Sequence, residues 1–554
     1  MDRRRPTTSW RQPSAASTSR PWAADRPTPL PATSCSASPR ATASKGARSH
    51  RRFAAPTSRG GPSRSCRRST PWPTISTPGR ASAARTARAC PWGADPPPFA
   101  SPGSPWVARV ADLTELAGVA VEAARDHESV EAYAEEARRT EVTAHKGEVE
   151  GLTFAESRGV GIRLIANGRL GYAYAADPSL EEVREALARA RESAELATED
   201  EFNALPPAEP IEPISALFRQ DQAALVTERK VSVALDLEHL AVSADPRVTK
   251  VDQAGYGDAV SRVAIASTGG VNAEYGRTDC WAVVSALAEQ DGETQAGWSF
   301  RVARELGELD WGSVANEAVE RSARLLGAVK PASGRVPVVL DPFAGSSFLG
   351  VLAGALSAES VQKQRSLFAD LLGEAVGSPL LTLVDDGRTL DGPAAATFDD
   401  EGVPTGRTEL IAHGTLMAFL HNTYTARRGA TDSTANAKRG GYRTPPGVGT
   451  TNFFVLPGTT PVSDILRQAE GGVLIQDVSG VHSGANPISG EFSVGATGLR
   501  IQGGEVGEPL REMTVASTVP EMLKGIAAVG DDLRFFTAVG VPTILFAEMT
   551  VAGV

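Results

Sequence analysis

The feature that most constrains the fold is an abrupt change in apolar content near position 107. Residues 1–106 contain one Leu, one Ile, two Phe and no Val, whereas aliphatic side chains recur throughout residues 107–554. A segment with so little apolar surface cannot offset the entropy that it would lose on ordering. We therefore predict that residues 1–106 are disordered. The rest of the chain, about 448 residues, is long enough for two or three domains.

The first 106 residues are also basic, with 18 Lys or Arg against 3 Asp or Glu. No Met lies between Met1 and Met417, whereas Val107 and Val110 stand where the apolar pattern begins. Because alternative bacterial start codons decode as Val inside a gene, we interpret residues 1–106 as a misannotated N-terminal extension. A genuine disordered tail and a basic nucleic-acid-binding arm are the alternatives. No apolar run follows the first arginines, so no secretory signal is predicted.

The remaining residues are acidic, with 38 Lys or Arg against 63 Asp or Glu. This charge disfavours nucleic acid as a partner, because phosphate binding depends on clustered cations. Cys280 is the single cysteine after residue 106, so no disulfide is expected there and a reducing compartment is indicated. No run of 18 apolar residues occurs, which predicts no membrane-spanning helix. We expect a cytoplasmic protein.

Residues 107–330 show a helix, a strand-rich stretch and a helix, followed by a looser second copy of the same order. Ser179 and Glu182 have capping-box spacing, as do Asp112 and Glu115, and Asn167-Gly168 is a strong hairpin signal. The second copy predicts helices over 221–243 and 313–326 and strands over 247–256, 259–267, 271–279, 281–290 and 294–303. We predict an α+β region whose antiparallel sheet carries packed helices on one face.

A second region is predicted over residues 331–554, with the boundary near Pro331. It begins with a strand and a helix of small residues over 344–357. Many short strands with turn signals follow, including a hairpin at His413-Gly414. This pattern predicts a C-terminal domain built on a curved antiparallel sheet or barrel-like body.

Motifs for metal binding and phosphate binding are absent or incomplete. The sequence has no phosphate loop, no Rossmann glycine motif and no cysteine pair for zinc. The only His-Glu dipeptide is His127-Glu128, and no second imidazole follows it at helical spacing. We therefore predict no metal ligands and no catalytic residues in this chain.

Ser483 lies between two glycines, as the nucleophile of a Gly-x-Ser-x-Gly elbow does. An elbow requires a helix after the serine, and Asn486-Pro487 and Gly490 favour a turn instead. His413 and His421 lie at opposite ends of a predicted strand and are expected to be ordinary surface or core residues. The Asp-rich segments 385–387 and 399–402 are typical of acidic turns.

Several longer strings resemble the TldD/TldE metalloprotease family, and specifically its TldE branch, also called PmbA. The resemblance covers nearly all of residues 110–554. The strings are Ser366–Gly373, Asp399–Pro404, His421–Arg427, Gly484–Ser493 and Ala528–Leu533, with Glu141–Gly171 resembling the N-terminal sheet of the family.

The TldD branch carries a His-Glu-x-x-x-His motif on the helix after the domain boundary, with a cysteine near the C-terminus as a third zinc ligand. Counting back from Ser366 without gaps places the two histidines at Leu349 and Gly354 and the glutamate at Gly350. No cysteine follows Cys280. The resemblance therefore implies a TldE-like subunit that lacks zinc chemistry of its own.

The resemblance also implies partners for this chain. A TldD-like catalytic subunit would supply zinc and the general base, and small or unfolded peptides would be the substrates. A glycine-rich sheet can present backbone donors and acceptors to an extended peptide. The substrate-binding residues that we predict are Ser483, Gly484, Asn486, Gly490 and Phe492.

Two other functions remain open from the residues alone. The first is an independently active hydrolase with an unrecognised site that uses His413, His421, His482 or the acidic turns. The second is a non-enzymatic regulatory binding protein, because family members have been called gyrase modulators. Zinc content of the purified chain discriminates between the first of these and a non-catalytic subunit.

Overall fold

The computed structural model describes residues 112–553, so the predictions for residues 1–106 lie outside the described part of the chain. The chain divides into two units, residues 1–98 and 99–554, and the second unit contains every described residue. All that follows concerns this second unit.

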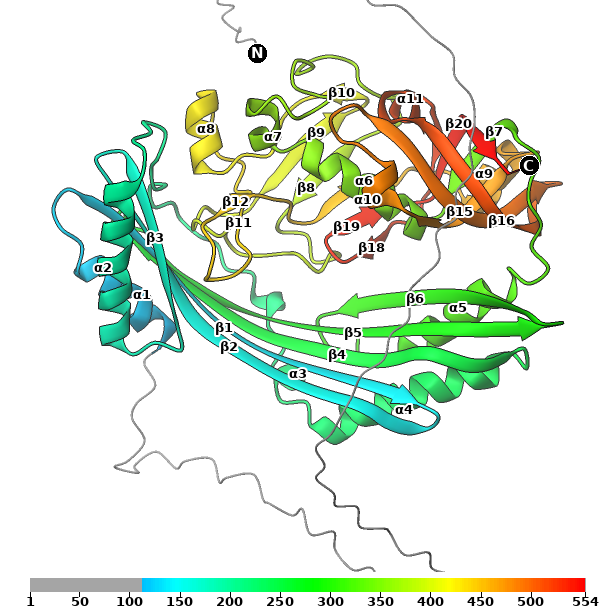
Figure 1. Cartoon of the computed structure of the whole chain (residues 1–554), viewed down its shortest axis with the longest axis horizontal. Coiled ribbons are helices and arrows are strands. Elements are labelled where there is room, and N and C mark those ends of the chain that lie inside the picture. Colours follow the sequence, from blue (N-terminus) through cyan, green and yellow to red (C-terminus); the bar gives the residue numbers. More distant parts are fainter. Residues whose placement is uncertain (1–111, 554) are drawn as a thin grey trace, which may run out of the picture. The chain divides into compact units, whose positions relative to one another are not determined.

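The first layer is a six-stranded antiparallel sheet with the order β3-β2-β1-β4-β5-β6, which we call the N-terminal sheet (Figure 1). Its strands are β1 (Glu128–His145), β2 (Glu148–Ala166), β3 (Arg169–Ala176), β4 (Val248–Ser267), β5 (Asn272–Gln290) and β6 (Glu293–Ala303). The two copies seen in the sequence meet where β1 pairs with β4. The predicted hairpin at Asn167-Gly168 is confirmed, and both residues adopt positive φ.

The prediction of two strands over 247–267 and two over 271–290 is wrong, because each pair forms one long strand. Gly257 and Asp258 interrupt the apolar alternation but stay extended and pair with Trp281 and Cys280. A Cβ at Gly257 would overlap the Trp281 ring, so this glycine serves close cross-strand packing and not a turn.

Helices cover one face of the N-terminal sheet. They are α1 (Leu113–Glu122), α2 (Leu180–Leu196), η1 (Ser215–Leu217), α3 (Gln220–Ala223), α4 (Thr227–Ala244) and α5 (Trp311–Ala323). The capping box of Ser179 and Glu182 is confirmed, whereas the Asp112 side chain at the start of α1 accepts from the Leu113 amide and the Thr114 hydroxyl. The single helix predicted over 221–243 is split into α3 and α4, because the chain turns extended at Val226.

The two faces of β1 have different neighbours because side chains alternate along a strand. Ala132 and Ala134 pack with the residues of α1 and α2 in one apolar cluster. Tyr133, between them, lies in another cluster with Phe398 and Tyr442 of the C-terminal domain. One face of the sheet therefore holds helices, and the other contacts the C-terminal domain.

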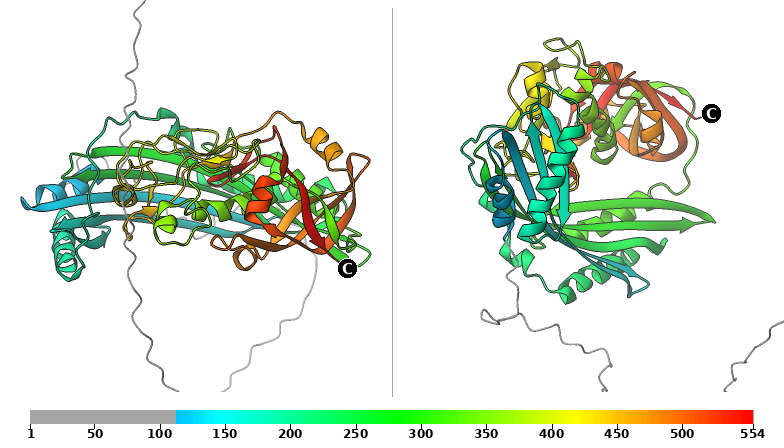
Figure 2. Two further views of the ribbon diagram at one scale, coloured as in Figure 1. Left: turned by 90° about the horizontal axis from the view of Figure 1, so that it is seen from above. Right: turned by 60° about the vertical axis from the view of Figure 1, so that its left-hand side comes forward.

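The C-terminal domain contains two six-stranded sheets. The first has the order β16-β15-β14-β7-β20-β17, and an additional pairing of β16 with β20 closes five strands into a barrel (Figures 1 and 2). The second has the order β10-β9-β8-β13-β19-β18. The predicted fold class, an α+β protein with a barrel-like C-terminal sheet, is confirmed.

The elements of this domain are short apart from helix α6 and the barrel strands β15, β16 and β20. Its strands are β7 (Gly334–Leu340), β8 (Leu383–Asp386), β9 (Arg407–Ala412), β10 (Thr415–Leu416), β11 (Ala437–Lys438), β12 (Gly447–Val448), β13 (Phe453–Val455), β14 (Val473–Ser479), β15 (Glu491–Gln502), β16 (Glu505–Thr518), β17 (Ile526–Val529), β18 (Arg534–Phe536), β19 (Val539–Val541) and β20 (Ile544–Ala552). Its helices are α6 (Pro342–Ala355), α7 (Ala358–Gln362), α8 (Thr423–Gly429), α9 (Val462–Gln468), α10 (Val481–Gly484) and α11 (Val519–Lys524). The hairpin at His413-Gly414 is confirmed, with a second strand of only two residues.

Within residues 112–553, none of the helices combines the length and the apolar character that a bilayer crossing requires.

Candidate functional site

Helix α6 is the element on which the family resemblance places its catalytic motif. Asp341 caps the helix by accepting from the Ala344 amide (2.8 Å), and Pro342 occupies the first turn. Phe348, Leu349 and Leu352 are almost fully buried. This buried face of α6 anchors the helix in the largest apolar cluster of the domain.

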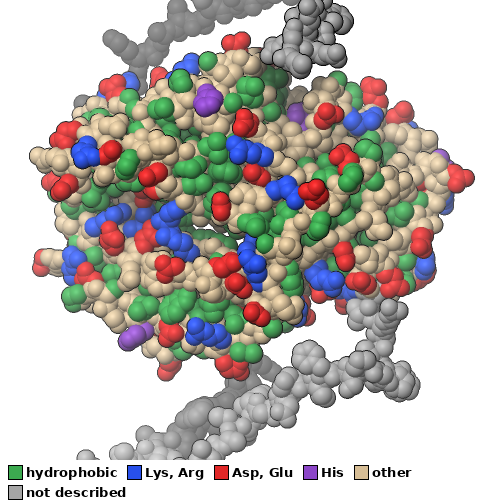
Figure 3. All heavy atoms as spheres, turned by 180° about the vertical axis from the view of Figure 1, so that it is seen from behind, with side chains coloured by type: hydrophobic (Ala, Val, Ile, Leu, Met, Phe, Trp, Pro, Cys, Tyr) green, Lys and Arg blue, Asp and Glu red, His purple; other side chains and the backbone are tan. Residues whose placement is uncertain are grey.

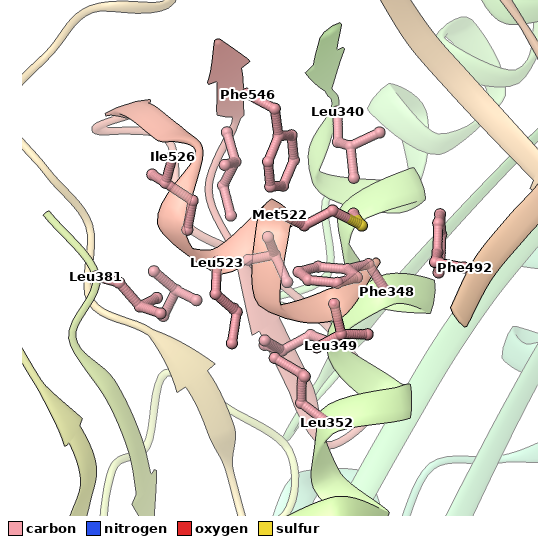
Figure 4. Packing of buried hydrophobic residues seen from close by; sticks show 14 of the residues in the cluster. Leu340, Phe348, Leu349, Leu352, Leu381, Phe492, Met522, Leu523, Ile526 and Phe546 are labelled. Atoms are coloured by element: carbon pink, nitrogen blue, oxygen red, sulfur yellow. The ribbon is translucent and has the colours of Figure 1, made fainter. Parts of the chain in front are cut away.

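Figure 4 shows the partners of this buried face. Phe348 and Leu349 lie beside Met522 and Leu523 of α11. The Phe348 ring meets those of Phe492 and Phe546 edge to face, at centroid separations of 5.7 and 5.9 Å. Such edge contacts favour one defined packing of α6 against the barrel.

The opposite face of α6 is open and lined by small residues. Gly350 and Gly354 are exposed, and a Cβ at either position would meet no atom within 4 Å. Ser347 and Val351 are half-buried and complete a stripe at helical spacing. Of the three positions that the motif count picks out, Gly350 and Gly354 share this open face, whereas Leu349 belongs to the core.

A loop from Gly480 to Glu491 follows β14 and contains most of the predicted substrate-binding residues. The prediction of a turn without a helix at Ser483 is wrong, because Val481–Gly484 form one helical turn, α10. Gly480 adopts positive φ and allows the chain to turn sharply after the strand. The Ser483 hydroxyl donates to the Gly480 carbonyl oxygen (3.1 Å) and is exposed.

Asn486 and Gly490 shape the rest of this loop. The Asn486 side chain accepts from the amides of Ile488 (2.9 Å) and Ser489 (3.2 Å), as in an Asx turn. The Gly490 amide donates to the Asn486 carbonyl oxygen (2.8 Å). The Asn486 side chain is exposed and Gly490 is buried.

Gly484 and Phe492 are closely packed by neighbouring residues. A Cβ at Gly484 would overlap the Ser493 carbonyl oxygen, so the close approach of α10 to β15 requires glycine. Phe492 is 2% exposed and packs on Phe348. The structure therefore presents Ser483 and Asn486 to solvent, whereas Phe492 supports α6 from within the core.

The three histidines of the alternative hydrolase hypothesis lie in separate elements. His413 occupies the β9–β10 turn with positive φ, and His482 is exposed on α10. His421 is half-buried before α8, its Nδ1 has no hydrogen-bond partner, and burial lowers its pKa. Among residues 112–553, no three His, Cys, Asp or Glu side chains come close enough to hold a metal ion.

A buried ion network was not predicted from the sequence. Arg163 of β2 donates to Glu131 of β1 (2.6 Å) and to Glu401 (2.5 Å), and Arg439 pairs with the other oxygen of Glu131. All four side chains are at most 5% exposed. Burial acts to raise the pKa of Glu401, but Arg163 and the Thr423 amide outweigh it and lower the pKa. The sequence signal was a lone arginine inside the apolar run Ile162–Ile165.

The two segments predicted as acidic turns differ in structure. Asp385 and Asp386 end strand β8, so the turn there begins only at Gly387, whereas residues 399–402 form a turn that is buried and holds loops in place. Asp399 accepts from the amides of Glu401 (2.9 Å), Val403 (3.0 Å) and Ala437 (3.0 Å), and burial together with Glu401 raises its pKa. These amides occupy the lone pairs that acid–base chemistry would need. The predicted turn is present, since Gly402 adopts positive φ and its amide donates to the Asp399 carbonyl oxygen (2.9 Å).

Three models of one protein family match consecutive parts of this chain. They are the PmbA/TldA metallopeptidase domain 1 over residues 130–194, the central domain over 221–326 and the C-terminal domain over 333–553. Together they span more than half of the chain. The chain therefore belongs to the PmbA/TldA metallopeptidase family, and the family resemblance seen in the sequence is confirmed.

Individual relatives carry both names used within this family. The metalloprotease PmbA of Escherichia coli O157:H7 is 25% identical, over 74% of this chain and 89% of its own length. A TldD homologue of Haemophilus influenzae is 27% identical, over 72% of this chain and 88% of its own length.

Two solved structures share the fold. A protein from Thermotoga maritima, described in relation to modulation of a DNA gyrase, matches with a TM-score of 0.72 and 26% identity over 77% of this chain and 96% of that chain. TldE from Thermococcus kodakarensis matches with a TM-score of 0.71 and 24% identity over 77% of this chain and 97% of that chain.

Proposed function

We propose that this chain is the non-catalytic, TldE-like subunit of a heterodimeric TldD/TldE zinc peptidase that acts in the cytoplasm on small or unfolded peptides. The observation that carries this proposal is the chemistry of α6. Where the motif count places the ligands and the base of a TldD-type subunit, this chain has Leu349, Gly350 and Gly354. Gly350 and Gly354 lie on the open face of α6, and Leu349 lies in the core.

Zinc does not fit the residues present on α6. Its open face offers the Ser347 hydroxyl and backbone, whereas zinc sites in proteins use imidazole, thiolate and carboxylate groups. No side chain of the described α6 belongs to these classes. We therefore assign no step through zinc to this chain, and its TldD-like partner supplies the metal and the general base.

The role left to this chain is to complete the site in which a peptide is held. The loop from Gly480 to Glu491 packs through Val481 and Ala485 against the apolar cluster that holds α6. Phe492, the residue after the loop, contacts Phe348 of that helix. The exposed polar groups of the loop, Ser483 and Asn486, stand on a backbone in which the amides of Gly484 and Gly490 donate to carbonyl oxygens of the same loop. A peptide binding there would contact a preformed surface, which reduces the entropy lost on binding.

The test is reconstitution with a partner that contains His-Glu-x-x-x-His. We expect the two chains to co-purify, and peptide cleavage to require both of them. Zinc measured by mass spectrometry is expected only in preparations that contain the partner. Stoichiometric zinc in this chain alone, or cleavage by it alone, would contradict the proposal and favour the independent hydrolase.

The contribution of the loop is tested in the same reconstituted pair. We expect the double substitution Ser483→Ala with Asn486→Ala to lower the cleavage rate while association with the partner stays unchanged. Gln502→Ala, exposed at the turn between β15 and β16, is the matched control. An unchanged cleavage rate would remove the loop from the peptide-binding surface.

A further inference from the structure

A cavity of about 540 Å³ lies between the N-terminal sheet and the second sheet of the C-terminal domain, and no residue of α6 or of the Gly480–Glu491 loop lines it. Its walls come from the end of β6, from the loop 390–393 and from residues 533–535 at the start of β18. Figure 3, drawn from behind, shows a hollow in the surface with Lys or Arg and Asp or Glu side chains around its rim. We call the space lined by these three segments the β6–β18 cavity.

Arginines dominate the charge of the β6–β18 cavity. Arg301 and Arg304 come from β6 and the residue after it, and Arg534 comes from β18. The acids in the lining are Glu308, which pairs with Arg219 (2.9 Å), and the exposed Asp391. A cationic cavity is unusual for residues 107–554, in which acids outnumber bases.

Two carboxylates behind the cavity are shared by several guanidinium groups. Glu317 pairs with Arg534 (2.7 Å) and with Arg301 (3.3 Å). Asp279 pairs with Arg277 (2.7 Å) and with Arg304. Four cations therefore share two anions. When Asp391 at the rim is also counted, and Glu308 is taken as neutralised by Arg219, one positive charge remains in excess at the cavity.

Two further observations agree with a missing anion. The Arg301 Nη1 atom is buried and has no hydrogen-bond partner, an arrangement that costs free energy until an acceptor arrives. Burial lowers the pKa of Arg304, and the charge of Arg277 lowers it further.

The rest of the lining suits an extended chain with apolar side chains. Leu390 is 45% exposed, and Leu533 and Phe535 are half-buried beside it. β6 and β18 are each the last strand of their sheet, so each has one edge without a neighbouring strand in the described structure. Free strand edges are where extended peptides add to a sheet.

We propose that the β6–β18 cavity binds a carboxylate of an extended peptide, with Arg301 and Arg534 as the cationic groups and with Leu390 and Phe535 contacting an adjacent apolar side chain. The planar guanidinium group matches a carboxylate through two parallel hydrogen bonds. The carboxylate is either the C-terminus of the peptide or an acidic side chain. The choice of a peptide rests on the proposed function.

The test measures binding of unlabelled, unstructured peptides without other acidic groups to the full chain without a partner, by isothermal titration calorimetry. One peptide ends in a free C-terminal Leu, a second is its C-terminal amide, and a third is an amide with two internal Glu residues. We expect the amide to bind roughly tenfold more weakly than the free acid. Binding restored by the internal Glu residues would identify side-chain carboxylates as the source.

Variants locate the binding to this cavity. Arg301→Gln is expected to weaken binding of the free-acid peptide by roughly tenfold. Arg335→Gln, in the exposed pair with Glu548, should leave this binding unchanged. Asp391→Asn removes an exposed acid from the rim and should tighten binding about two- to fivefold. Asp391→Asn keeps the test decisive even if Arg301→Gln fails to fold.

Equal binding of the acid and both amides would overturn the proposal, as would an Asp391→Asn protein with unchanged affinity for the acid. Because no partner or cleavage enters this assay, its failure leaves the proposed subunit role intact. Loss of co-purification in the reconstitution test would affect that role alone.

Discussion

At the scale of single residues, burial sets the chemistry of the acidic groups in the two segments that the sequence predicted as acidic turns. Asp385 of β8 is 2% exposed and accepts from the Thr451 amide (2.8 Å), the Thr451 hydroxyl (2.6 Å) and the Asn436 side chain (2.7 Å). Burial nevertheless raises its pKa to about 6. The cost of removing the charge from water outweighs the hydrogen bonds.

This pKa predicts a pH dependence that Asp385→Asn should remove. The folded protein holds the proton on Asp385 more tightly than the unfolded chain does, so this group stabilises the fold below pH 4. That stabilisation is lost as the pH rises to about 6. The free energy of unfolding of Asp385→Asn relative to the wild type should therefore rise by about 3 kcal/mol between pH 4 and 7.

Urea unfolding at several pH values measures this difference. The test concerns only how this difference in the free energy of unfolding changes with pH. The introduced amide also alters the hydrogen bonds to Thr451, but that contribution to the free energy does not depend on pH. Asp432→Asn, at an exposed acid, serves as the control and should show no such slope. A constant difference between wild type and Asp385→Asn would show that Asp385 ionises normally in the folded protein.

At the scale of elements, the loop from Gly480 to Glu491 contains two kinds of residue. Some support the conformation of the loop, and others have exposed side chains that are free to bind a ligand. A strand, a sharp turn and a helical turn succeed one another there, which resembles a nucleophile elbow in outline. The Ser483 hydroxyl is nevertheless bonded to the Gly480 carbonyl oxygen, and among the described residues no histidine accepts a hydrogen bond from it. The loop geometry therefore supports binding better than nucleophilic attack.

Gly484→Ala and Ser483→Ala should behave differently in this element. The new methyl group at 484 would overlap the Ser493 carbonyl oxygen, so we expect Gly484→Ala to lower the free energy of unfolding by about 1–3 kcal/mol. Ser483→Ala, at an exposed position, should change it by less than about 0.5 kcal/mol. Chemical denaturation measures both. A neutral Gly484→Ala would mean that α10 moves freely relative to β15.

At the scale of the whole molecule, the segments that match the family models all follow the composition change at 107. They are residues 130–194, 221–326 and 333–553. Because residues 1–106 contain one Leu, one Ile and no Val, they are expected to add little to the stability of the fold.

A chain that begins at Val107 should therefore unfold at the same temperature as the full chain, within about 1 °C by calorimetry. It should also co-purify equally well with a TldD-like partner. A lower unfolding temperature would show that residues 1–106 contribute to the fold. N-terminal mass spectrometry of the protein from its native host tests separately whether translation begins near Val107.

Local pattern alone was sufficient for part of this architecture. The capping box at Ser179, the hairpin at Asn167-Gly168 and the small-residue helix over 344–357 depend on contacts within a few residues of one another. Their physical causes are therefore visible in the sequence. The barrel-like sheet was also predicted from its many short strands. Family resemblance added the position of α6 relative to the catalytic motif.

Tertiary structure decided what depends on distant neighbours. Gly257 interrupted an apolar pattern and was taken for a break, but the Trp281 ring on the adjacent strand explains it. The network of Glu131, Arg163 and Glu401 joins residues up to 270 positions apart, and no local pattern can reveal such a pairing. The same holds for the β6–β18 cavity, whose arginines face each other only because two sheets meet. The sequence by itself determined which segments could fold and which chemistry α6 lacks, because both depend on the residue types present. Only the tertiary structure decided which charges and edges share a space, because that depends on packing.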